Sequence, residues 1–261
     1  MVSIRHPAVA GMFYPGEPEQ LRHQVQHFLG QAGQPRLSPK ALIAPHAGYI
    51  YSGPIAASAY AQLAPLRDTI SRVVLLGPAH RHPFTGLAYS SAEVFRTPLG
   101  DISVDLEALQ GLQDLPQVRL LDAAFAGEHS LEVHLPFLQS VLTEFRLVPL
   151  VVGDAATDEV AEVLERLWGG DETLIVISSD LSHYLRYEQA KAMDAQTTRA
   201  IEELRPEAIS YHHACGRNPV TGLLRVAQRR GLHAITLDLR NSGDTAGPRD
   251  QVVGYGAYAI A

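Results

Sequence analysis

The stretch KALIAPHAGY, residues 40–49, indicates the fold of this chain. It opens with an apolar run, residues 41–44, that has no polar alternation, as in a strand covered on both faces. Pro45 cannot continue a central strand, so the chain turns there and leaves His46 just past the strand's end. In open α/β sheets, ligands bind in the crevice at the carboxyl ends of the strands. His46 is therefore predicted to lie where a site would form.

The same arrangement recurs twice more along the chain. The strand predicted over residues 72–77 leads to His80, and residues 173–178 lead to Asp180 and His183. Three strands that each deliver a histidine past their ends predict a shared site at one sheet edge. Imidazole suits Zn, Cu, Fe and Ni, and two histidines plus one anionic ligand can activate O₂ at non-haem Fe(II).

The anionic partner has two candidates. Asp180 lies three residues before His183 and could reach the same pocket, or it could only cap a loop. Cys215 directly precedes a predicted helix over residues 219–229, whose N-terminus would lower the thiol pKa and favour the thiolate. A lone cysteine is otherwise a small buried apolar residue. The residues alone leave this choice open.

A fourth histidine candidate lies in the segment GEHSLEVHLP, residues 127–136. The spacing from His129 to His134 does not match the H-E-x-x-H zinc motif. His129 could hydrogen-bond a substrate or carry protons near neutral pH, or it could be a buried histidine bonded to backbone. Both interpretations stay open.

The apolar runs and the helical periodicity between them predict one α/β domain over residues 1–261. A β-α-β succession implies parallel strands with right-handed crossovers, so we expect a central, mostly parallel or mixed sheet flanked by helices. Helices are predicted over residues 17–29, 54–64, 105–112, 138–145, 157–168, 188–204 and 219–229. Further strands are predicted at residues 146–153, 234–239 and 252–260.

Composition narrows the class of protein. The 46% hydrophobic residues suffice for a large core, and the net charge of −7 without a basic block argues against nucleic-acid binding. No apolar run approaches the roughly 18 residues that span a bilayer, and the first residues lack a signal-peptide core. A single cysteine excludes an internal disulfide. We therefore expect a cytoplasmic protein that binds neither membrane nor nucleic acid.

Six motifs in order along the chain resemble those of one family. They are A-P-H-A-G-Y (44–49), L-G-P-A-H (76–80), F-R-T-P-L-G (95–100), E-H-S-L-E-V-H-L-P (128–136), S-S-D-L-S-H (178–183) and C-G-R-N-P (215–219). The chain resembles the Memo family, whose bacterial and archaeal members are called AmmeMemoRadiSam system protein B. The likeness runs from Pro7 to near the C-terminus.

The Memo family is similar in fold to class III extradiol ring-cleavage dioxygenases. By that resemblance His46 and His80 match the two histidine metal ligands, and Cys215 matches the cysteine that completes the Memo metal site. The dioxygenases use a glutamate as third ligand. A thiolate is softer and more strongly donating, which moves the site toward copper, zinc or a thiolate-ligated iron. Catechol ring cleavage is therefore not carried over.

The same resemblance implies roles for three more residues. His183 matches the acid/base histidine of the dioxygenases, His129 matches a histidine that contacts substrate, and Asp180 matches an acidic residue that lines the pocket. Eukaryotic relatives suggest copper or iron handling and phosphopeptide binding. The latter fits poorly, because no arginine cluster marks an anion pocket.

Three hypotheses follow for the function. The first is a metal-dependent, O₂-using oxidoreductase of a small-molecule substrate, with Fe(II) expected and copper or zinc as alternatives. The second is a non-catalytic metal-binding or partner-binding component of a system that includes a radical-SAM protein. The third is a metallohydrolase with zinc-bound water. A homodimer is left open.

Overall fold

Four parallel strands form the centre of the molecule, a computed structural model that describes residues 2–261. In spatial order they are β2 (Ala41–Ala44), β9 (Thr173–Ser178), β3 (Arg72–Pro78) and β8 (Arg146–Val152). Every residue of β2 and β9 is buried, as their unbroken apolar runs predict.

Antiparallel pairing at both margins makes the nine-stranded sheet mixed. Beyond β2 lies β12 (Val252–Ile260), which runs antiparallel to it and also pairs with β11 (Ala234–Asn241) and β10 (His183–Leu185). Beyond β8 lie β4 (Leu87–Tyr89) and β7 (Val118–Leu120). A separate three-stranded sheet contains β1 (Ile4–Arg5), β5 (Val94–Thr97) and β6 (Gly100–Ser103).

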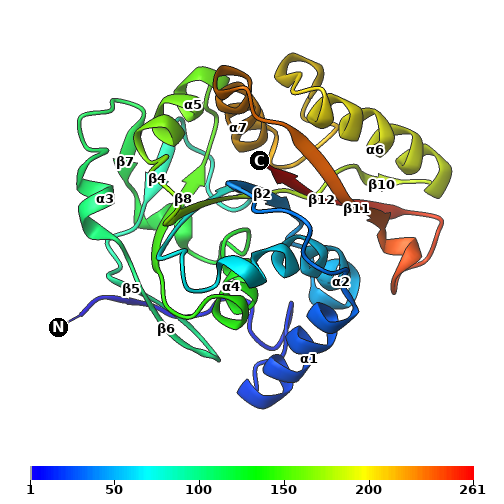
Figure 1. Ribbon diagram of the computed structural model, residues 1–261, viewed down its shortest axis with the longest axis horizontal. Helices are drawn as coiled ribbons and strands as arrows, with labels where there is room; N and C mark the ends of the chain where they lie inside the picture. The colour runs from blue at the N-terminus through cyan, green and yellow to red at the C-terminus, as the bar shows by residue number, and fades with distance from the viewer. Residues whose placement is uncertain (1) are drawn as a thin grey trace.

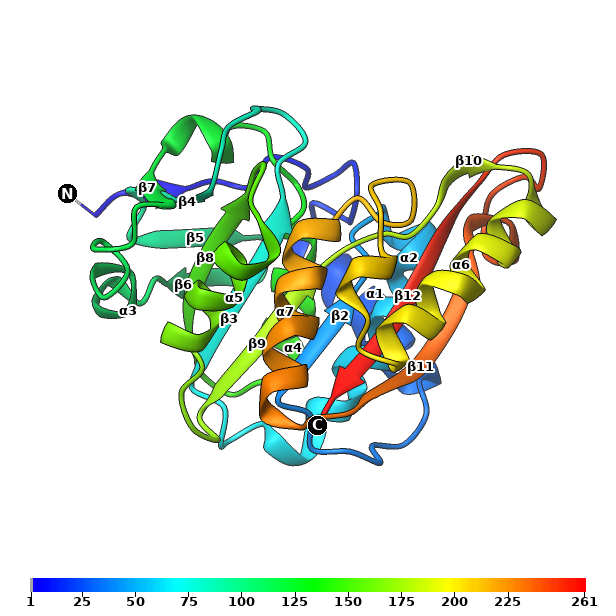
Figure 2. The same cartoon turned by 90° about the horizontal axis from the view of Figure 1, so that it is seen from above.

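Helices cover both faces of the large sheet (Figures 1 and 2). One face carries α1 (Pro18–Gln31), α2 (Tyr49–Tyr60) and α4 (Leu135–Val141). The other carries α5 (Thr157–Arg166), α6 (Tyr187–Glu202) and α7 (Arg217–Arg230). The short α3 (Leu106–Gln110) lies near β8. Short 3₁₀ helices are η1 (Ala61–Leu66), η2 (Asp122–Phe125), η3 (Glu132–His134), η4 (Pro206–Ala208) and η5 (Ser242–Asp244).

The predicted fold class is confirmed, but two predicted helices are displaced. The helix predicted over residues 138–145 is α4, which covers Leu135–Val141, so its start and its end both lie earlier in the chain. The helix predicted over residues 54–64 begins at Tyr49, and Pro54 lies inside it. The sequence predicts this proline in the first turn of the helix, where it is tolerated without loss. Here Gly48 caps the helix, so Pro54 removes one internal hydrogen bond, which leaves the helix intact because Ile55, Ala56 and Ala57 behind it are buried. The last residues of the predicted segment form η1.

The parallel strands all point toward the same sheet edge. Residues 45–46, 79–80 and 179–180 follow the ends of β2, β3 and β9, so the loops that carry the predicted histidines meet there. Across residues 2–261, no helix combines the length and the apolar character that crossing a membrane would require.

Candidate metal centre

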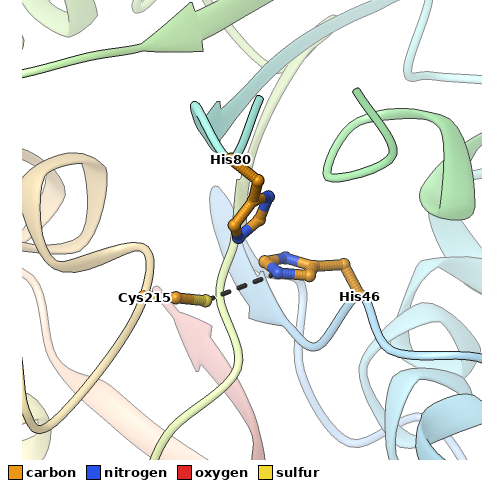
Figure 3. Close-up of side chains that lie close together, drawn as sticks. All are labelled: His46, His80 and Cys215. Carbon is orange, nitrogen blue, oxygen red and sulfur yellow. Dashed lines mark hydrogen bonds between the residues drawn. The ribbon is translucent and has the colours of Figure 1, made fainter. Parts of the chain in front are cut away.

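Three side chains from three separate loops converge at this edge (Figure 3). His46 follows β2, His80 follows β3, and Cys215 precedes α7. Their donor atoms all lie within 4.8 Å of one another, and Cys215 Sγ is 3.4 Å from His46 Nε2. His46 is buried, Cys215 half-buried and His80 exposed, so the group is open to solvent on the His80 side.

The hydrogen bonds of His46 fix which ring nitrogen is free. The Ser178 hydroxyl lies 2.6 Å from His46 Nδ1 and also donates to the Ser130 carbonyl at 2.6 Å. Because a hydroxyl has one proton, Ser178 must accept from Nδ1–H. Burial and the neighbouring histidines hold the pKa of His46 well below its usual range. The ring is therefore neutral, with the lone pair of Nε2 facing the cysteine.

Glu128 fixes His80 in the same way. Its Oε1 lies 2.9 Å from His80 Nδ1, and its Oε2 accepts the His80 backbone N–H at 2.6 Å. Burial would raise the pKa of Glu128, but hydrogen bonds from His80 and Ser130 lower it to about 2. The ionised carboxylate accepts Nδ1–H and leaves Nε2 as the free donor atom. A carboxylate behind a histidine is the usual support of a metal-ligating imidazole.

A second group that could hold a metal ion, His80, Glu128 and His129, is better explained as this supporting shell. Glu128 Oε1 also accepts the backbone N–H groups of His129 and Ser130, at 2.9 and 2.8 Å. With the two bonds from His80, both carboxylate oxygens are occupied by donors. A cation there would have to displace these hydrogen bonds.

Asp180 and Cys215 are joined through the backbone. The Asp180 N–H donates to Cys215 Sγ at 3.3 Å, and the buried Asp180 carboxylate accepts the His46 N–H at 2.8 Å. Asp180 Oδ2 lies 3.9 Å from His46 Nε2. Burial raises the pKa of Asp180 to about 6. Asp180 thus lies against the cluster and orders the loop that carries His46.

The predicted lowering of the Cys215 pKa is wrong. α7 begins two residues beyond Cys215, as the prediction required. Burial nevertheless raises the pKa of the thiol, and the Asp180 carboxylate raises it further. Desolvation of the thiolate outweighs the helix N-terminus here. A metal ion bound at the sulfur would displace the thiol proton.

The other two histidines lie at different depths. The His129 ring stacks on His80, with 4.7 Å between ring centroids, and is backed by Phe13 at 4.7 Å. Its Nδ1 is buried and has no hydrogen-bond partner among residues 2–261. His183 is exposed and lies outside the group of donor atoms. Its Nδ1–H donates to the Leu181 carbonyl at 2.8 Å, which leaves Nε2 as a proton acceptor.

Comparison with known proteins places the chain in a family. A family model described as Memo-like protein matches residues 5–259. This chain belongs to the Memo-like family. A MEMO1 family protein of Aquifex aeolicus is 37% identical over 264 residues, 97% of each chain. One of Aeropyrum pernix is 38% identical over 286 residues, 99% of this chain and 100% of the relative. One of Sulfolobus acidocaldarius is 34% identical over 277 residues.

The sequence alone does not identify the residues that support the candidate ligands of this Memo-like chain. Ser178 and Ser130 lie 48 residues apart and meet only because β9 ends beside the loop after η2. Asp194, on α6, accepts the Ser182 N–H at 3.0 Å and holds the loop between Asp180 and His183 from behind. The only local signal was polarity directly after a buried strand, in the S-S-D run of residues 178–180.

Proposed function

We propose that this Memo-like protein binds one metal ion through His46, His80 and Cys215 and uses it in an O₂-dependent oxidoreductase reaction on a small molecule. The observation that carries the proposal is the direction of the two imidazoles. Each has its Nδ1–H engaged by a buried acceptor, so each offers Nε2 toward the cysteine sulfur. Two imidazoles and one thiol, whose donor atoms already lie within 4.8 Å of one another, fit a metal ion.

The donor set restricts the metal. A thiolate with two imidazoles suits iron, copper or zinc, whereas magnesium and calcium prefer oxygen ligands. Three protein ligands leave positions open, as catalytic sites do and closed structural sites do not. Fe(II) or copper at this position would supply redox chemistry with O₂.

The surrounding residues then have distinct roles. His183 Nε2, with its lone pair free, accepts a proton from the substrate. His129, held between Phe13 and His80, positions the substrate. The Asp180 carboxylate holds the His46 loop through the His46 N–H.

Elemental analysis of untagged protein purified without oxygen tests the metal assignment. We expect about one iron or copper per chain in the wild type, and loss of that metal in His46→Ala and in Cys215→Ser. His23→Ala is the matched control, because His23 is exposed on α1. A wild type without stoichiometric metal, or ligand variants that keep it, would contradict the proposal.

A second candidate is a non-catalytic metal-binding or partner-binding component working with a radical-SAM protein. The position of His183, exposed and outside the donor cluster, favours it, since a catalytic base is expected within reach of the reacting atoms. Stoichiometric metal without O₂ consumption over a panel of aromatic diols, together with co-purification of such a partner, would select this candidate.

A further inference from the structure

A groove of about 400 Å³ opens beside the cysteine of the candidate centre. Cys215 lies among its lining residues, together with the residues that lead from β3 to His80 and the first turn of α7. His46 and His80 do not line it. The groove therefore approaches the three-residue group from the sulfur side, and its volume suits a small molecule rather than a folded partner.

Two aromatic rings form its walls. Phe84 is half-buried, and Tyr211 is 61% exposed. The Tyr211 ring is nevertheless held in place, because the Arg217 guanidinium lies 4.6 Å from its centroid and its hydroxyl donates to Asp154 Oδ1 at 3.2 Å. An exposed aromatic side chain held in this way presents a flat, apolar surface to an occupant.

The charge in the lining of the groove is negative. Asp154 is the only charged side chain in its lining, and Asp154 Oδ2 makes no hydrogen bond within residues 2–261. The amide of Asn218 is already engaged, since its nitrogen donates to the Gly153 carbonyl and its oxygen accepts from Arg217, both at 2.9 Å. An anionic occupant would meet the carboxylate and no cation in the lining.

We propose that this groove is the substrate subsite of the centre and takes a small aromatic amine, with its ring against Phe84 and Tyr211 and its ammonium on Asp154. The proposal rests on the proposed function, because the groove would hold the cationic aromatic part of the substrate beside Cys215. His129 and His183 do not line the groove and would act on the part of the molecule that lies at the metal. It assigns the substrate to a chemical class, cationic and aromatic, and excludes carboxylates and phosphates of similar size.

Two probes that share a hydroxyphenyl ring and differ in the charge of the tail test the assignment. They are tyramine and 4-hydroxyphenylacetate, titrated into the full chain by calorimetry. We expect tyramine to bind at least about tenfold more tightly than the acid, since one charge-assisted hydrogen bond is gained and one repulsion avoided. Equal affinities, tighter binding of the acid, or no binding of either probe would overturn the proposal.

Variants locate the binding. Tyr211→Ala should weaken the binding of tyramine about tenfold, whereas Tyr211→Phe, which keeps the ring, should bind tyramine as tightly as the wild type does. Asp154→Asn should remove the preference for the amine. Tyr184→Ala is the control, because Tyr184 is 70% exposed and lies outside the groove. Unchanged binding in Tyr211→Ala and Asp154→Asn, or a loss in Tyr184→Ala, would place the probe elsewhere and overturn the proposal.

Metal content measured on the same samples separates the two possible failures. If Tyr211→Ala and Asp154→Asn keep both their metal and the wild-type affinity for tyramine, the assignment of the groove is wrong and the metal centre is not affected. A wild type that binds tyramine at the groove but contains no stoichiometric metal contradicts the proposed function, and with it the role of the groove as a substrate subsite.

Discussion

The Ser178 hydroxyl and the His46 imidazole form a 2.6 Å hydrogen bond whose direction is set by a third group. The Ser178 hydroxyl donates its only proton to the Ser130 carbonyl. His46 must therefore donate from Nδ1–H, and its Nε2 must remain unprotonated. All of these atoms are buried, and water cannot substitute for the bond without rearrangement. In the metal-free chain, His46 Nε2 is thus already unprotonated and directed at the candidate centre.

Ser178→Ala should weaken metal binding without removing a ligand. His46 would lose the acceptor that orients its ring, and losses of such partners typically cost 10- to 100-fold in metal affinity. We expect at least about a tenfold rise in the dissociation constant for Co²⁺, measured by competition with a chelator. Ser182→Ala is the control, because Ser182 is buried in the loop that follows β9 but has no hydrogen bond to His46, His80 or Cys215. Equal affinities in the two variants would refute the role of Ser178.

Glu128→Gln should affect both stability and metal binding. The carboxylate accepts N–H groups on both oxygens, and a carboxamide must turn its own NH₂ toward one set of them. We expect the free energy of unfolding of the metal-free chain to fall by about 2 kcal/mol, and Co²⁺ affinity to fall about tenfold. Urea unfolding and the same chelator competition measure the two effects.

The control for this change is Glu93→Gln. The Glu93 carboxylate accepts one long hydrogen bond within residues 2–261, 3.4 Å from the Ser3 nitrogen to its Oε1, and no hydrogen bond joins it to His80. It should change neither quantity measurably. If Glu128→Gln behaves like Glu93→Gln, the carboxylate is not the support of His80.

Much of the fold could be predicted because buried parallel strands have a distinctive composition. Residues 41–44 and 173–178 have no polar alternation, and both form strands at those positions. Three histidine-bearing loops could be assigned to one edge because parallel strands share their direction. The start of α2 could not be predicted, because a proline near the start of a helix is far commoner than one five residues inside it.

The site could be predicted only in part, since its details depend on non-local contacts. His183 follows a buried strand as His46 and His80 do, yet β10 pairs His183 with Val253 of β12 and leaves the side chain exposed. The Cys215 thiol lies near a helix N-terminus, but the surrounding packing decides its pKa. The spacing of residues in the sequence predicts neither how deeply a side chain is buried nor which strand pairs with its own.

The N-terminal segment is anchored beside the site by one buried ion pair, which yields a third prediction. Glu132 is fully buried and accepts from Arg5 at 3.0 Å, from the Ala8 and Val9 N–H groups, and from the Tyr14 hydroxyl. Arg5→Ala leaves this carboxylate without its countercharge. We expect a loss of about 3 kcal/mol in the free energy of unfolding, measured with urea.

A second arginine–carboxylate pair provides the comparison for Arg5→Ala. Arg96 and Asp101 are bonded at 2.6 Å, but both side chains are exposed to solvent. Arg96→Ala should therefore leave the unfolding midpoint unchanged within error. A similar effect in both variants would mean that burial does not determine the contribution of the Arg5–Glu132 pair.

Asp194 should make stability fall as pH rises. Burial raises the pKa of Asp194 from 3.8 to about 6, against the opposing effects of the Ser182 hydrogen bonds and the charge of His183. Between these two values the folded chain binds a proton that the unfolded chain has released. Since the unfolded state then binds fewer protons, the free energy of unfolding decreases with pH across that window and levels off above it.

Asp194→Asn isolates this contribution, because the amide oxygen can still accept the Ser182 N–H. The wild-type free energy of unfolding minus that of the variant should fall by about 2 to 3 kcal/mol between about pH 4 and about pH 7. Urea unfolding at each pH gives the difference, from which the other titrating groups cancel. A difference that does not change with pH would show that Asp194 has the same pKa in the folded and the unfolded chain. The burial of Asp194 beside the Asp180–His183 loop would then not destabilise its charged form.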